Sequence, residues 1–121
     1  MFELQRPYLY YVLDADKNIL ATTDLKKWGE WFGSSPDRFL KQEYIKSGDQ
    51  EYFVSTVFLA VDHSYMGGTP ILFETMVLES GKMSEVYMQR YTEYDEAMRG
   101  HEAIMSMLKE KGVEGLPDDS V

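Results

Sequence analysis

Three ionisable residues stand among apolar neighbours in the segment AVDHSYMGGTPILFETM, which begins at position 60. Asp62 and His63 precede a glycine-containing loop, and Glu74 lies within the apolar run that follows this loop. Carboxylate and imidazole groups in such a setting suit proton transfer, ligand binding or metal coordination. A buried charge without a partner is unfavourable, so we expect Glu74 to be paired or protonated. Arg90 and His101 are the candidate partners.

The expected register of the hairpin limits what these residues can do together. A loop over residues 63 to 69 pairs Asp62 with Pro70 and Phe58 with Glu74. Asp62 and Glu74 are then separated by four residues along a strand, about 13 Å, so they cannot share one metal unless a bulge shifts the pairing. A slip of one residue instead places His63 on the face of Glu74.

The motifs that are absent narrow the possible chemistry. The sequence contains no phosphate-binding loop, no dinucleotide fingerprint and no Gly-x-Ser-x-Gly elbow. There are two histidines, so one subunit cannot supply a three-histidine metal site. A site with two histidines and one carboxylate, formed by His63, His101 and Glu74, remains open.

Each candidate also has a purely structural interpretation. His101 lies on an apolar helix stripe, where a histidine can be a hydrogen-bonded core residue. Glu74 can be the ion-pair partner of Arg90. Asp62 can open the loop through an Asx turn, and His63 can be an exposed loop residue.

Composition and charge exclude several classes of protein. The chain has 121 residues, 44% of them hydrophobic, which suits one domain with one core. No cysteine is present, so disulfides and thiolate chemistry are excluded. The formal net charge of −9 disfavours nucleic acid and anionic membranes as partners, and no apolar run is long enough to cross a bilayer. No secretion signal is recognised, so we expect a cytoplasmic protein.

The elements that must position these residues are strands and two helices. Aromatic and β-branched runs predict strands at 8–13, 19–22, 40–45, 51–61, 70–79 and 84–91. Thr23 or Asp24 caps a first helix that ends at GSSP (33–36), and Ser35 with Pro36 starts another short turn. Thr92 caps a last helix that ends near Gly112.

The last helix carries one apolar stripe, and this stripe should pack on the sheet. Its members are Tyr94, Ala97, Met98, His101, Met105 and Leu108. The predicted fold class is therefore α+β: an antiparallel sheet of about five or six strands, one inserted helix and a C-terminal helix packed on one face. Residues 1–112 form a single domain, and 113–121 form a flexible acidic tail. The central strands are apolar on both faces, which favours coverage from both sides and allows a homodimer.

Several spaced blocks resemble a known group of proteins. The blocks are STVFLAVDHSYMGGTPILFETMV (55–77), RY (90–91) and AMRGH (97–101). They resemble a family of small uncharacterised proteins that are common in phages and prophages. The resemblance covers the C-terminal half, and this chain departs from the pattern with Ala60 in place of glycine and Tyr94 in place of tryptophan.

The resemblance implies a phage or prophage origin and a cytoplasmic setting, but it brings no known reaction. It maps Asp62, His63, Glu74, Arg90, Gly100 and His101 onto the polar positions of the family pattern. These residues are therefore expected to form one site.

Three functions follow as hypotheses. In the first, a phage accessory or counter-defence protein binds a small anionic ligand, such as a nucleotide, in a pocket near the central hairpin. Its ligand-binding residues would be Asp62, His63, Tyr65, Glu74, Arg90 and His101, with guanidinium and imidazole on phosphate and Tyr65 as a stacking face. In the second, a divalent metal held by His63, His101 and a carboxylate supports hydrolysis. In the third, the protein blocks a basic surface of a host protein. Binding is ranked first because the spacing enforces no catalytic geometry, so no catalytic residue or obligatory cofactor is assigned.

Overall fold

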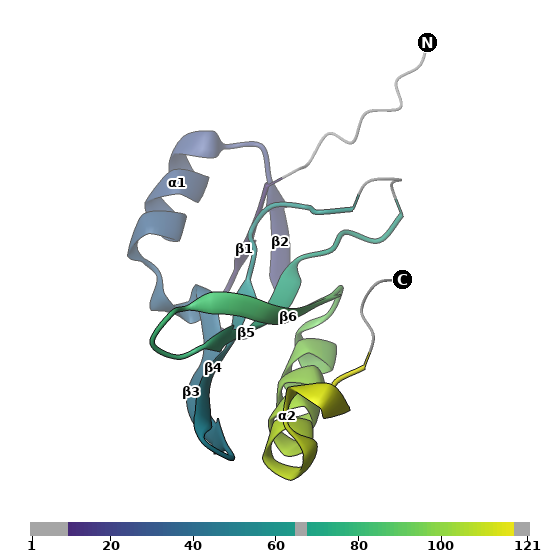
Figure 1. The fold of residues 1–121 in the computed structure, drawn as a ribbon. Helices are drawn as coiled ribbons and strands as arrows, with labels where there is room; N and C mark the ends of the chain where they lie inside the picture. The colour runs from purple at the N-terminus through teal and green to yellow at the C-terminus, as the bar shows by residue number, and fades with distance from the viewer. Residues whose placement is uncertain (1–9, 65–67, 118–121) are drawn as a thin grey trace.

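Six strands build two antiparallel sheets in the computed structural model, which describes residues 10–64 and 68–117 (Figure 1). The smaller sheet pairs β1 (Tyr10–Leu13) with β2 (Ile19–Thr22). The larger sheet has the order β3 (Phe39–Ser47), β4 (Gln50–Phe58), β5 (Phe73–Glu79) and β6 (Ser84–Tyr91). The predicted α+β class is confirmed, and the expected strands are divided between two sheets.

The first helix begins and ends where the sequence indicates. Helix α1 (Leu25–Ser34) has Asp24 as its N-cap, and the Asp24 carboxylate accepts a hydrogen bond from the Lys27 backbone N–H at 3.1 Å. Ser35 then caps a short 3₁₀ helix, η1 (Pro36–Arg38), in which proline stands at the first position.

The last helix, α2 (Tyr94–Lys111), has Glu93 as its N-cap, so the prediction of Thr92 is wrong by one residue. Thr92 has a different role: its backbone N–H donates to the Glu96 carboxylate at 3.1 Å. The helix ends at Gly112, whose φ of 72° is a conformation that favours glycine. A 3₁₀ helix, η2 (Val113–Gly115), opens the predicted tail, and Val113 packs against the core.

The register between β4 and β5 differs from the prediction by one residue. Glu74 pairs with Val57, and Phe58 pairs with Phe73. The chain leaves the larger sheet just beyond this point, because Ala60 adopts a left-handed conformation with φ of 68°. It then bridges to the smaller sheet, where Val61 pairs with Tyr10. The predicted strand at 51–61 therefore ends early, and its last residues join the two sheets.

One face of the larger sheet packs against α2 (Figure 1). Successive residues along each strand point alternately toward the helix and away from it. The buried residues of α2 are Ala97, His101, Ile104 and Leu108. Ile104 and Leu108 pack with Val54 and Val77 in one core cluster. A second cluster around Phe58 and Phe73 joins the smaller sheet and α1 to this core.

The tryptophan Trp28 fastens α1 to the junction between the sheets. Its indole N–H lies 3.1 Å from the backbone oxygens of both Tyr11 and Ala60. Its ring stacks on Phe32 at 5.0 Å. Neither helix in the described ranges combines the length and apolar character needed to cross a bilayer.

Candidate functional site

A histidine without solvent exposure lies between α2 and the sheet. His101 is 0% exposed, and both of its ring nitrogens are bound within the protein. Nδ1 lies 2.7 Å from the hydroxyl of Thr56 on β4, and Nε2 lies 2.8 Å from the carboxylate of Glu43 on β3. His101 therefore joins the helix to two strands, as the structural interpretation of this residue predicts.

The hydrogen bonds continue from His101 across the sheet. Thr56 and Thr75 are direct cross-strand partners, and their hydroxyl oxygens lie 2.5 Å apart. The hydroxyl of Tyr91 on β6 donates to Thr75 at 3.1 Å. We call Tyr91, Thr75, Thr56, His101 and Glu43 the buried relay. Its members run from β6 through β5 and β4 to α2 and β3.

The carboxylate of Glu43 assigns the tautomer of the histidine. A carboxylate only accepts hydrogen bonds, so Nε2 of His101 carries the proton and donates to Glu43, and Nδ1 accepts from the Thr56 hydroxyl. A consistent series of donors then runs from Tyr91 through Thr75 to Thr56. Burial raises the pKa of the Tyr91 hydroxyl, so this group stays a donor to higher pH than an exposed tyrosine.

Gly100 allows the first donor to reach the relay. A Cβ atom at this position would collide with the Tyr91 hydroxyl and would lie 2.5 Å from ring atoms Cε1 and Cζ. Glycine next to His101 is thus required by close approach of the tyrosine, not by backbone conformation.

A small charged cluster covers the solvent end of the relay. The Lys41 ammonium contacts the Glu102 carboxylate and lies 3.9 Å from Glu43. The hydrogen bond between Lys41 and Glu102 raises the pKa of Lys41 and lowers the pKa of Glu102. Glu43, His101 and Glu102 offer ligand atoms that lie within 4.8 Å of one another, a spacing that suits a metal ion.

Two features of this cluster oppose metal binding. Lys41 already supplies a positive charge between the two carboxylates. In addition, Nε2 of His101 carries the proton in the tautomer that the relay fixes, whereas a metal needs the lone pair of this atom. With both nitrogens of His101 occupied, the arrangement also offers none to a metal shared with His63.

Glu74 and Arg90 meet on the opposite face of the sheet. They are direct cross-strand partners on β5 and β6, and the Arg90 Nε donates to the Glu74 carboxylate at 3.0 Å. Since the neighbouring Thr75 points toward α2, Glu74 points away from it. The prediction that Glu74 pairs with Arg90 is confirmed, and His101 is not its partner.

Asp62 and His63 lie in a third place, beyond the end of β4. The Asp62 carboxylate accepts hydrogen bonds from the backbone N–H groups of Ser64 at 2.8 Å and Ile71 at 3.1 Å. It therefore ties together the two ends of the loop, as an Asx turn does. His63 is half-buried and its backbone N–H donates to Ile71. Tyr65, the expected stacking residue, lies outside the described residues.

The five residues of the expected ligand site that the structure describes are thus divided among three places. Glu74 and Arg90 are together, His101 is on the other side of the sheet, and Asp62 with His63 organises a loop. Their binding of a ligand stays a prediction.

The members of the buried relay that the sequence did not predict are Thr56, Thr75, Tyr91 and Glu43. The first three lie within the blocks STV, FETM and RY that carry the resemblance, and this was the available signal.

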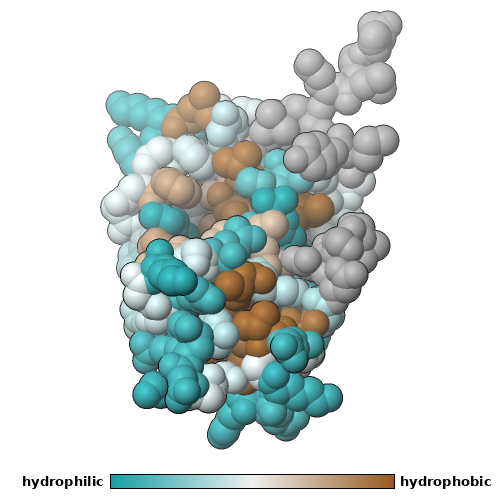
Figure 2. All heavy atoms as spheres, in the orientation of Figure 1, coloured by the Kyte–Doolittle hydropathy of each residue, from teal (hydrophilic) through white to brown (hydrophobic). Residues whose placement is uncertain are grey.

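The face that carries Glu74 and Arg90 is largely apolar and incompletely covered. Register places Tyr44, Phe53, Val57, Met76, Leu78 and Met88 there, and we call this surface the open face. All of them retain exposed area, and Tyr44 is 60% exposed. Figure 2 shows one side of the molecule, where hydrophobic residues reach the surface over β6 among hydrophilic ones.

Comparisons with known proteins were made at three levels. No family model, no curated protein and no solved structure matches this chain.

Proposed function

We propose that this protein acts by binding another protein, and that the open face is its recognition surface. One observation carries this proposal: the face opposite α2 presents adjacent, partly exposed apolar side chains from all four strands. Contiguous exposed apolar surface of this kind is typical of interaction sites.

The polar groups on the open face favour a specific contact. Gln42 donates to Ser55 at 2.9 Å, and Arg90 is paired with Glu74. These bonds hold the two side chains in place, and the remaining N–H groups of Arg90 and Gln42 can donate to a partner. Apolar residues then supply the binding free energy, while the ion pair at one end of the face helps to set the orientation.

Net charge indicates the kind of partner. Two copies of a chain with charge −9 repel one another at long range, whereas a basic protein is attracted. This supports a basic partner rather than the homodimer, which needs the same surface. Together with the resemblance to phage proteins, it supports a host protein as the target and the cytoplasm as the place of action.

The other two hypotheses receive less support from the geometry. A nucleotide-type ligand needs Arg90 and His101 on one phosphate, and these residues lie on opposite faces of the sheet. Metal-dependent hydrolysis needs a free nitrogen on His101, and both of its nitrogens have protein partners. Protein binding through the open face needs no change in the side-chain partners that the structure shows.

Site-specific photo-crosslinking in living bacteria tests the proposal. A photoreactive phenylalanine analogue replaces Met76 or Met88 on the open face, and Ala103 on the exposed side of α2 serves as the matched control. We expect one discrete crosslinked species from positions 76 and 88 and none from position 103. Crosslinks to a second copy of the chain would replace the basic partner with a homodimer. Equal, diffuse crosslinking from all three positions would overturn the proposal.

A further inference from the structure

The strand β3 is an edge of the larger sheet. It pairs with β4 on one side, and no strand in the described ranges pairs with its other side. An edge strand presents backbone N–H and C=O groups that another extended chain can bind. The only register shift in β3 lies between Phe39 and Lys41, so the stretch from Gln42 to Ser47 keeps regular pairing geometry.

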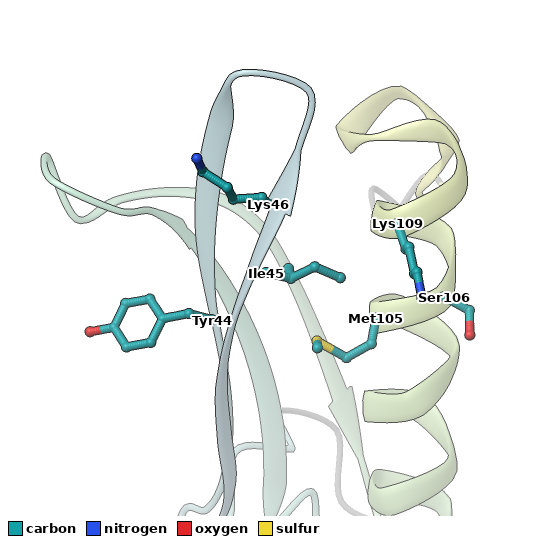
Figure 3. Close-up of a pocket in the computed structure, with 6 residues that line it drawn as sticks. All are labelled: Tyr44, Ile45, Lys46, Met105, Ser106 and Lys109. Atoms are coloured by element: carbon teal, nitrogen blue, oxygen red, sulfur yellow. The ribbon is translucent and has the colours of Figure 1, made fainter.

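A groove runs between this edge and α2 (Figure 3). Ile45 on β3 and Met105 on α2 point toward one another and form its apolar floor. Lys109 and Ser106 line it from the helix, whereas the Lys46 side chain leaves β3 on the side away from α2 (Figure 3). The cavity volume is about 350 Å³, enough for one or two side chains.

Two lysines stand on either side of the β3 edge. Lys46 and Lys109 form no ion pair with any residue that the structure describes, in contrast to Lys41, which is held by Glu102. Lys109 stands at the groove, whereas Lys46 projects from the other face of β3, across from Glu51 (Figure 3). In a chain of net charge −9, these two cations are local points of attraction for anionic groups along the edge.

We infer that this groove binds an extended acidic peptide segment, which adds to the edge of β3 as a further strand. This site goes beyond the recognition surface proposed above, since it uses the edge of the sheet and α2 instead of the open face. Backbone hydrogen bonds to β3 supply affinity. Alternate side chains of the peptide point to opposite sides of the β3 edge. Apolar residues enter the groove and contact Ile45 and Met105, while carboxylates approach Lys46 on the other side of the strand and Lys109 at the helix.

Fluorescence anisotropy with defined peptides tests the inference on the full chain. The probe is a fluorescein-labelled peptide of alternating valine and aspartate, about ten residues long. Its controls are the valine–lysine peptide and a valine–aspartate peptide with methylated backbone nitrogens at alternate positions. We expect binding of the first peptide only, because the controls remove the charge match and the backbone donors in turn. Equal binding of the lysine peptide would overturn the inference.

Variants locate the site on the protein. Lys46→Glu and Lys109→Glu should each weaken binding at least about tenfold, whereas Lys26→Glu on α1 makes the same charge change elsewhere and should alter it less than about twofold. Amide chemical shifts should move along β3 and near Met105. Met76→Asp on the open face should leave peptide binding unchanged, which separates this site from the proposed recognition surface. Equal losses in all three lysine variants would show non-specific charge attraction and overturn the site.

Discussion

The two faces of the larger sheet invert the usual distribution of residues. The face under α2 buries two threonines, a tyrosine hydroxyl and a histidine, and every one of these polar groups is hydrogen-bonded. The open face leaves methionine, leucine and aromatic side chains partly exposed. A fully bonded buried network fixes one packing arrangement of the helix on the sheet, whereas exposed apolar surface favours association. The comparison places stability on one side of the strands and the proposed recognition on the other.

Removing the centre of the buried relay should give the largest effect. His101→Ala removes one hydrogen-bond partner from each of Thr56 and Glu43 and opens a cavity, so the free energy of unfolding should fall by about 3 to 5 kcal/mol. Denaturant unfolding measures this loss. His63→Ala, on the half-buried loop, should cost less than about 1 kcal/mol. Similar losses in both variants would contradict a special role for the covered face.

Two helical glycines give the next test, because the same substitution should lower stability at one position and raise it at the other. Gly100→Ala forces Tyr91 away from Thr75 and should destabilise the protein by about 2 to 3 kcal/mol. Gly29→Ala in α1 meets no atom within 4 Å and should stabilise it by up to about 1 kcal/mol through helix propensity. Thermal unfolding compares them. A stable Gly100→Ala variant would show that Tyr91 is not held as described.

Tyr91→Phe removes the first donor of the relay and should cost about 1 kcal/mol at neutral pH. The raised pKa of Tyr91 has a further consequence at alkaline pH. Its stabilising effect is complete below the pKa of an unfolded tyrosine, about 10, and is lost as the pH rises through the folded value. The difference in unfolding free energy between wild type and variant should therefore shrink above that pH. A difference that stays constant would contradict burial as the cause.

The smallest effect on stability is expected on the open face. Met76→Asp places a charge at a partly exposed position, so the free energy of unfolding should fall by less than about 1 kcal/mol. The photo-crosslinked species formed from position 88 should nevertheless disappear in this variant. If Met76→Asp unfolds the protein, the open face contributes to the core and the contrast between the faces fails.

Periodic sequence patterns predict most of the fold, because strands and helices differ in the spacing of their buried residues. The stripe on α2 correctly includes Ala97, His101 and Leu108, and the cross-strand pair of Glu74 and Arg90 follows from neighbouring strands. The predicted register between β4 and β5 was wrong, because the left-handed conformation of Ala60 ends the strand and no apolar pattern encodes a φ angle. The glycine of the family pattern at this position fits the same conformation.

The buried relay was harder to predict for a chemical reason. Threonine is a common strand residue, so Thr56 and Thr75 read as ordinary β-formers with weak polar character. Their role depends on being opposite one another on adjacent strands, and on a helix 45 residues further along the chain that brings His101 to Thr56. Glu43 stood outside the motif blocks altogether. Charged residues can be selected as candidates from the sequence, whereas a hydroxyl network can be identified only when the pairing of the strands is known.

The position of Trp28 has a consequence for spectroscopy. The chain has two tryptophans, and both are in α1. Because the indole of Trp28 is bound to backbone oxygens on either side of the junction between the sheets, its fluorescence reports whether the β1–β2 hairpin is seated. Far-ultraviolet circular dichroism, by contrast, senses all the helices and strands. Unfolding curves from the two signals should coincide if the molecule melts as one cooperative unit, and should separate if the N-terminal hairpin and α1 detach first.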